Sequence, residues 1–204
     1  MKIITGQYGG RRFDPPRNLQ ARPTTDLAKQ ALFNILQNRM DLDGCRALDL
    51  FSGTGSISFE LLSRGASFVV SVEKGRQQQK FIQQVATQLK VSAFRHQLIR
   101  GDVFRYLSSP PTMAHDFSGS SDQPFDIVFA DPPYDLPKLD KLPDLVLRPS
   151  WITPFGLTSW LAPDGIFILE HGKDNDFSSH PNFQEVRTYG AVHFSFFTLS
   201  QRPS

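Results

Sequence analysis

The chain has 204 residues, of which 39% are hydrophobic, and this is enough for one well-buried domain. The single cysteine, Cys45, excludes an internal disulfide framework, and the first residues, "MKIITGQYGGRR", contain no apolar run of signal-peptide length. The formal net charge is only +2, but the first forty residues hold seven Lys or Arg against two acidic residues. We expect a cytoplasmic protein, not bound to a membrane, with a basic N-terminal segment.

The N-terminal run "KIITGQYGGRRF" contains two short strand-like stretches that turn at Gly9 and Gly10. It predicts a β-hairpin that presents Arg11 and Arg12. Such a basic segment is either an ordinary solvated face or a set of cations that neutralise nucleic-acid phosphates. We treat residues 1–23 as an extension of the main domain, 24–204.

A helix is predicted for "TTDLAKQALFNILQNRM", which begins at a threonine cap. Apolar residues recur in it every four positions and form a stripe that should pack on the domain. The members of this stripe are Leu27, Ala31 and Ile35, widened by Leu32 and Leu36.

From Cys45 onward, short apolar runs alternate with helical patterns, which is typical of a parallel sheet covered by helices. Strands are predicted at about 46–50, 68–72, 96–100, 125–130 and 165–170. Helices are predicted at 55–65, closed by Gly65, and at 75–90, with a less regular region at 138–161 and a surface loop at 108–124. The runs at 183–190 and 192–199 read as an antiparallel hairpin around Gly190. The fold class is therefore α/β, a Rossmann-like doubly wound, mostly parallel sheet with an antiparallel C-terminal strand.

The motif "ALDLFSGTGS" places Asp49 near the end of the first strand, followed by a turn at Gly53 and Gly55. Glycine suits a turn where a side chain would collide with a ligand or where φ is positive. A dinucleotide fingerprint would need a third glycine where this chain has Ser58. A nicotinamide cofactor is therefore disfavoured.

Two further acidic residues follow the next strands. Glu73 comes twenty residues after Gly53, where a carboxylate can accept both ribose hydroxyls, and Asp102 follows the third strand. Because the carboxyl ends of parallel strands meet at one edge, Asp49, Glu73 and Asp102 should line one crevice. They suit S-adenosylmethionine, with Asp49 near its amino-acid end, Glu73 on the ribose, Asp102 on the adenine amine, and Phe104 or an apolar neighbour against the ring.

The motif "FADPPY" ends the fourth strand and puts Asp131 at the same edge. Pro132 and Pro133 fix φ and remove two amide donors, so the turn is stiff. Asp131 and the Pro132 carbonyl can accept the hydrogens of an exocyclic amine, while Tyr134 stacks on a flipped-out base. The motif predicts methylation of an amine on a planar nitrogen base.

The runs "GGRR", "RPTTDLAKQALFNIL", "ALDLFSGTGSISFELLSRGA" and "DPPYD" together resemble the RsmD family, the bacterial guanine-N2 methyltransferases of small-subunit 16S ribosomal RNA. The resemblance covers nearly the whole chain, and "RPTTD" is its most specific part. "EKG", with Gly75, and the long 108–124 loop depart from the family pattern. DPPY alone would also fit an adenine or cytosine amine, or a glutamine amide.

The resemblance implies S-adenosylmethionine as the cofactor and 16S rRNA, as part of a small-subunit assembly particle, as the partner. It implies these cofactor-binding residues: Asp49, Phe51, Gly53, Gly55, Glu73, Asp102 and Val103. The catalytic residues it implies are Asp131, Pro132 and Tyr134. The substrate-binding residues it implies are Arg11, Arg12, Arg22, Thr24, Thr25 and Pro133.

Two alternatives to this function stay open on the sequence. One is an amino-methyltransferase acting on adenine N6 of DNA or another RNA, and the other is a non-catalytic RNA-binding assembly factor. The five histidines show no metal-ligand spacing, so no metal site is predicted. A monomer is the expected state.

Overall fold

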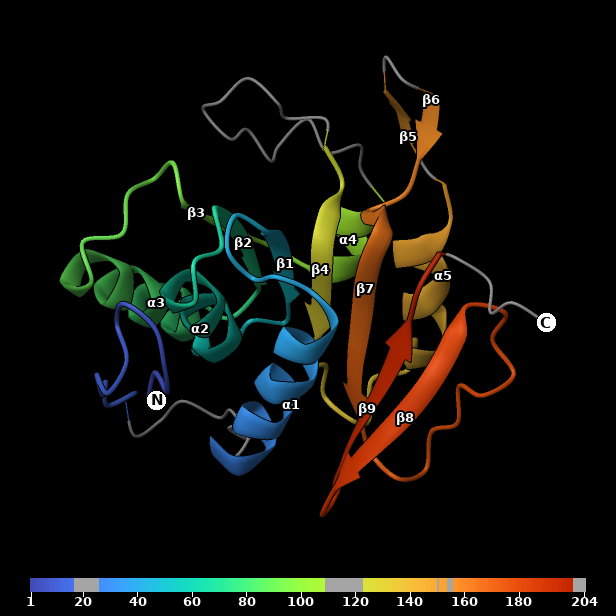
Figure 1. Cartoon of the computed structure of the whole chain (residues 1–204), viewed down its shortest axis with the longest axis horizontal. Helices are drawn as coiled ribbons and strands as arrows, with labels where there is room; N and C mark the ends of the chain where they lie inside the picture. The colour runs from blue at the N-terminus through green and yellow to red at the C-terminus, as the bar shows by residue number, and fades with distance from the viewer. Residues whose placement is uncertain (17–25, 109–122, 150, 154–155, 200–204) are drawn as a thin grey trace. The chain divides into compact units, whose positions relative to one another are not determined.

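A computed structural model of the chain consists of two compact units, Met1–Val103 and Phe104–Ser204 (Figure 1). The residues that it describes are 1–16, 26–108, 123–149, 151–153 and 156–199. Most of the predicted 108–124 loop lies outside these residues, as do Arg22, Thr24 and Thr25.

The first unit contains three parallel strands in the order β3-β2-β1. Their bounds are Arg46–Leu50 for β1, Phe68–Glu73 for β2 and His96–Arg100 for β3. In the register, Ser71 of β2 lies between Asp49 of β1 and Leu98 of β3. The first five residues of β2 are buried, which accounts for its continuous apolar character in the sequence.

Two helices provide the crossovers that parallel neighbours require. They are α2, Ser56–Ser63, which packs on β1 and β2, and α3, Arg76–Gln88, which packs on β3. The predicted end of α2 is confirmed, because Gly65 follows the helix with φ +106°. The three predicted strands of this unit are also confirmed, to within a residue.

Helix α1, Asp26–Arg39, is present, and its predicted buried stripe is confirmed at Leu32 and Leu36 but wrong at Leu27. Leu27 is 77% exposed, and Ala31 and Ile35 are only partly buried. The residues of α1 that are buried are Ala28, Lys29, Leu32, Phe33 and Leu36. The buried stripe of α1 therefore begins one residue later than predicted, at Ala28 instead of Leu27, and it includes Lys29.

The N-terminal segment forms a tight hairpin-like loop rather than two full strands. Lys2 and Arg12 make an isolated antiparallel bridge, and the Ile3 amide donates to the Arg11 carbonyl at 3.0 Å. Ile3 is completely buried. The segment is thus ordered and packed, as predicted, with a single bridge in place of the two short strands.

A buried ion pair fixes this segment to the two neighbouring helices. Lys29 Nζ of α1 lies 3.3 Å from Glu60 Oε2 of α2, and both side chains are almost inaccessible. The Glu60 carboxylate also accepts the amides of Ile4 at 2.7 Å and Thr5 at 3.1 Å. Arg64 Nε donates to the same carboxylate at 2.8 Å. Because each charge has partners, the desolvation of this pair is offset.

The second unit contains four strands in the order β4-β7-β9-β8. Strand β4 runs parallel to β7, whereas β9 is antiparallel to both β7 and β8. Their bounds are Phe125–Ala130 for β4, Leu161–His171 for β7, Phe183–Tyr189 for β8 and Val192–Phe197 for β9. The predicted C-terminal hairpin is confirmed, and the predicted strand at 165–170 is part of a longer one.

The region 138–161 is less helical than its pattern suggests. A short 3-10 helix η1 (Leu139–Lys141) and α5 (Leu142–Leu147) are followed by two paired strands, β5 (Trp151–Thr153) and β6 (Gly156–Thr158). One more short helix, α4, spans Val103–Leu107. Aromatic contacts fill this unit's core, including Tyr106 against Trp160 at 4.8 Å between ring centroids. Among the described residues, no helix is long and apolar enough to cross a bilayer.

Candidate active site

The turn after β1 adopts the unusual backbone that its glycines suggest. Phe51, Gly53 and Gly55 all have positive φ, at 60°, 54° and 74°. At Gly55 a Cβ would lie 2.8 Å from the Phe59 ring, so packing also requires glycine there. At Gly53 the nearest atom to a Cβ would be the Phe51 carbonyl oxygen at 3.9 Å. A ligand can therefore approach the backbone at Gly53 without a clash.

Glu73 at the end of β2 lies directly beside this turn. Its Oε2 accepts the Gly53 amide at 2.8 Å, and its Oε1 accepts the Gly75 amide at 2.6 Å. The structure thus places Glu73 beside the glycine motif, while its predicted bonds to a ribose stay a prediction. A carboxylate has about four acceptor sites, so these two bonds leave capacity for the hydroxyls of a ribose.

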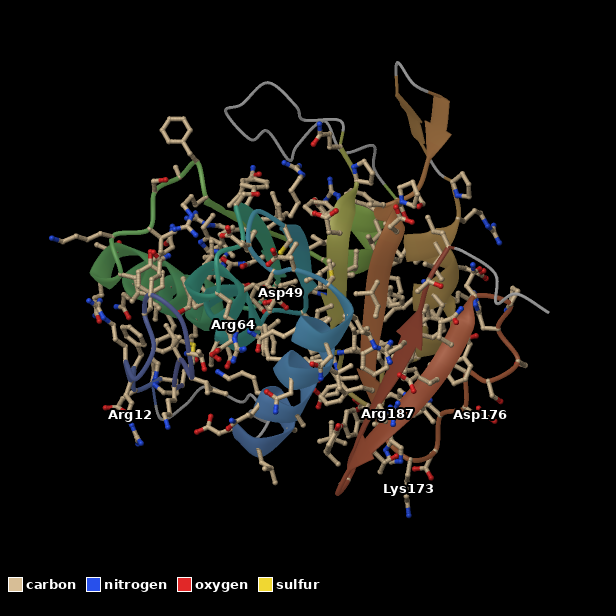
Figure 2. All side chains as sticks on the ribbon, in the orientation of Figure 1. Arg12, Asp49, Arg64, Lys173, Asp176 and Arg187 are labelled. Carbon is tan, nitrogen blue, oxygen red and sulfur yellow. The ribbon has the colours of Figure 1, made fainter. Side chains whose placement is uncertain are left out.

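Asp49 has a different environment from the one expected of a residue that contacts a ligand. It is 1% exposed, and its Oδ2 accepts the Ser58 amide at 3.1 Å and the Ser58 hydroxyl. Burial raises the pKa of the Asp49 carboxyl to about 7, although the Ser58 hydrogen bonds act in the opposite direction. In this structure Asp49, labelled in Figure 2, is joined to the first turn of α2 by the Ser58 hydrogen bond. Its contact with a cofactor stays a prediction.

The hydrogen bonds of Asp49 continue across the sheet. The Ser58 hydroxyl lies 2.7 Å from the Ser71 hydroxyl, which in turn lies 2.7 Å from His96 Nε2. Burial lowers the pKa of His96 to about 4, so the ring is neutral at pH 7. This chain of polar groups joins β1, α2, β2 and β3 beneath the glycine turn.

Asp102 lies close to Glu73 along the edge of the first unit. The Gly101 amide donates to the Glu73 carbonyl at 3.1 Å, and the side chain of the following Asp102 is 42% exposed. Asp102 Oδ2 is 3.5 Å from Lys74 Nζ. Val103, which begins α4, is buried. The first unit thus brings Gly53, Glu73 and the Asp102 turn to one edge, where two carboxylates that are not fully buried suit the polar groups of a nucleoside.

In the second unit, the DPPY motif leaves the carboxyl end of β4 as predicted. Asp131 and Tyr134 are partly buried, Pro132 is buried and Pro133 is exposed. The Leu136 amide donates to the Pro133 carbonyl at 3.0 Å, which closes a turn. The motif is therefore a stiff turn with an acid and a ring at its two ends.

Tyr134 is held by a residue that the sequence reasoning did not identify. Its hydroxyl donates to Oε1 of Glu170 at 3.2 Å, and Glu170 on β7 is only 3% exposed. A Cβ at Gly172 would lie 3.0 Å from Tyr134 Cδ2, so the ring packs closely on this glycine. Glu170 and Gly172 together fix the orientation of the ring. In the sequence, only the position of Glu170 and Gly172 at the end of the predicted strand could have indicated this role.

Of the predicted RNA-binding residues, the structure describes Arg11 and Arg12. Both are exposed, and Arg12 is labelled in Figure 2. The Arg11 guanidinium donates to the Gln88 carbonyl at the end of α3, at 3.5 Å. Lys29, which contributes to the basic N-terminal count, is buried against Glu60 and is therefore unavailable to RNA. Its spacing from Leu32, Phe33 and Leu36 could have placed it on the inner face.

Comparison with known proteins identifies the family. The family model described as Conserved hypothetical protein 95 matches residues 1–198. Ribosomal RNA small subunit methyltransferase D of Haemophilus influenzae is 27% identical, over 97% of this chain and 93% of its own length. A Bacillus subtilis protein provisionally named rRNA methyltransferase YlbH is 32% identical, over 85% of this chain and 84% of its own length.

A solved structure of Escherichia coli yhhF, provisionally titled a methyltransferase, has a TM-score of 0.75 at 23% identity and covers 97% of this chain and 96% of its own. A second solved structure, titled as a methyltransferase complexed with SAH, has a TM-score of 0.59 at 17% identity. The match covers 85% of this chain and 50% of that structure's chain. These structural matches confirm the Rossmann-like α/β fold. The chain belongs to the RsmD family.

Proposed function

We propose that this protein transfers a methyl group from S-adenosylmethionine to the exocyclic N2 of a guanine in 16S rRNA of the small ribosomal subunit. The observation that carries the proposal is the DPPY turn at the end of β4 in a chain of the RsmD family. The relatives named Ribosomal RNA small subunit methyltransferase D support the choice of ribosomal RNA.

The cofactor supplies an electrophilic methyl group on a cationic sulfur, and the residues of the first unit would hold it. Glu73, already bonded to the Gly53 amide, accepts the ribose hydroxyls. Asp102, half-exposed, accepts the adenine amine, and Phe51 and Val103 contribute apolar contacts. Asp49 acts on the cofactor indirectly, because its hydrogen bond to Ser58 fixes the N-terminal turn of α2.

The residues of the DPPY turn act on the base. The guanine N2 amine is a weak nucleophile because its lone pair is delocalised into the ring. Asp131 and the Pro132 carbonyl accept its two hydrogens, which orients the lone pair and stabilises the positive charge that develops. Asp131 then takes the proton. Tyr134, oriented by Glu170, stacks on the flipped-out base.

The basic N-terminal segment binds the RNA around the target nucleotide. Arg11 and Arg12 contact phosphates, while Arg22, Thr24, Thr25 and Pro133 complete the substrate-binding set. We propose that the substrate is a small-subunit assembly particle and that the enzyme acts as a cytoplasmic monomer. Residues 1–23 form the RNA-binding extension of the 24–204 methyltransferase domain.

The test is transfer of label from radioactive S-adenosylmethionine to three substrates: small subunits from cells lacking the enzyme, naked 16S rRNA and DNA. Label in rRNA, and more in particles than in naked rRNA, is expected. Label in DNA would instead support an adenine-N6 enzyme. No transfer to any substrate, despite cofactor binding, would favour a binding protein without activity.

A further inference from the structure

The segment from β2 to the turn after β3 carries an unusual distribution of charge. Between Glu73 and Asp102 the sequence contains no acidic residue. It contains six basic residues: Lys74, Arg76, Lys80, Lys90, Arg95 and Arg100. This segment comprises α3, the loop after it and β3.

The polar side chains of α3 face away from the core. The helix buries Phe81, Ile82 and Val85 against the sheet. Its exposed residues are Arg76, Gln77, Lys80, Gln83, Gln84, Thr87 and Gln88. Lys74 in front of the helix, Lys90 behind it and Arg100 at the end of β3 are exposed as well. The outer face is therefore cationic and otherwise neutral.

The charge at the start of α3 does not stabilise the helix. Cations are unfavourable near the positive, N-terminal end of a helix dipole and favourable near its C-terminal end. Helix α3 begins with Arg76 and has no acidic residue in its first turn, whereas Lys90 follows the C-terminal cap, where a cation is favourable. Helix stability therefore does not account for Arg76.

The loop after α3 adds an exposed aromatic ring next to an anchored arginine. Phe94 is 62% exposed in the loop before β3. Its neighbour Arg95 is anchored, because Nη2 donates to the carbonyls of Leu62 at 3.1 Å and Ala66 at 2.9 Å. Arg11 donates to the Gln88 carbonyl at the end of α3, at 3.5 Å. The exposed ring is therefore attached to a backbone position whose neighbour is fixed to the core.

We propose that the outer face of α3, with Lys90 and Phe94 at its end, is a contact surface for the RNA substrate. Phosphates of an RNA strand lie along the cations, and an unpaired base stacks on Phe94. A helix of 13 residues is about 20 Å long, so this surface extends from the edge that carries Glu73 over a span of several nucleotides. The inference rests on the proposed RNA substrate and adds a second contact surface to the residues that act on the methylated base.

The first test measures binding of 16S rRNA transcribed in vitro at increasing salt. The double variant Lys80→Gln/Lys90→Gln should reduce the slope of log affinity against log salt by about 1.5, since each lost phosphate contact contributes roughly 0.7 to 0.9. The matched control, Lys141→Gln/Lys173→Gln, removes the same charge from exposed positions in the second unit and should leave the slope unchanged. Equal slopes for the first variant and the wild type would overturn the proposal.

The second test addresses the aromatic contact. Phe94→Ala should weaken rRNA binding about fivefold or more, and Phe94→Trp should restore it. S-adenosylmethionine affinity, measured in the same preparations, should be unaltered. An unchanged rRNA affinity of Phe94→Ala would refute stacking. Loss of binding to small subunits alone, with naked rRNA unaffected, would assign the surface to a protein partner and refute an RNA surface.

These experiments distinguish failure of the α3 surface from failure of the proposed function. If the wild type transfers no methyl group to rRNA, the proposed function fails whatever the variants do. If it does transfer methyl groups and the α3 variants bind and methylate as the wild type does, only the α3 surface fails.

Discussion

Asp49→Asn tests the role that the structure gives to the buried carboxylate. Burial raises the pKa of Asp49 from its ordinary value of 3.8 to about 7, so the folded state holds this proton more tightly than the unfolded chain does. The contribution of Asp49 to the free energy of unfolding is fully present below about pH 4 and is lost as the pH rises to about 7. At about 1.36 kcal/mol for each pKa unit, the loss between pH 5 and pH 8 is about 3 kcal/mol. Asparagine does not titrate, so Asp49→Asn should not show this loss.

The assay is urea unfolding of both proteins at pH 5 and pH 8. Any constant effect of the amide on packing cancels when the two pH values are compared, as do the other titrating groups. The wild type should lose about 3 kcal/mol more than Asp49→Asn over this range. Parallel stability curves for the two proteins would show that Asp49 ionises in the fold without penalty, and the reasoning from its burial and Ser58 bonds would be wrong.

Three further predictions follow from the contacts described above. Asp131→Asn should abolish turnover while the cofactor Kd, measured by calorimetry, stays within about twofold; full activity would remove Asp131 from the mechanism. Glu60→Gln should lower the free energy of unfolding in urea by about 3–5 kcal/mol, because it leaves the buried Lys29 without its carboxylate, and Lys29→Met in that background should recover part of the loss. Burial lowers the pKa of His96 to about 4, so the unfolded chain takes up a proton between pH 6.5 and pH 4 and stability falls as the pH falls. Between pH 7 and pH 5 the wild type should lose about 2 kcal/mol of unfolding free energy that His96→Gln does not lose. An equal loss in the two proteins would contradict this account.

The strands of the fold were predictable because their signals are local. Mostly apolar runs such as "FVVSV" and "FDIVFA" are bounded by polar or turn residues, and the structure starts and ends β2 and β4 at these limits within a residue. The glycine and DPPY motifs were located for the same reason, since each directly follows a strand.

The buried faces and polar partners were harder to predict because they depend on tertiary contacts. In α1 the apolar spacing could have indicated the inner face with Lys29, but no local signal indicates that Glu60 of another helix is the buried partner of this lysine. Likewise, no local pattern indicates that Asp49 bonds to Ser58 or that Glu170 orients Tyr134. Those pairs are nine or more positions apart in sequence and meet only in the folded chain.

The most direct test of the proposed reaction is the identity of the nucleoside that receives the methyl group. Small subunits from cells lacking the enzyme are incubated with the purified protein and S-adenosylmethionine, and the digested 16S rRNA is analysed by mass spectrometry. The account predicts N2-methylguanosine as the new nucleoside, absent when Asp131→Asn replaces the wild type. A different methylated nucleoside, or N2-methylguanosine formed equally well by Asp131→Asn, would contradict it.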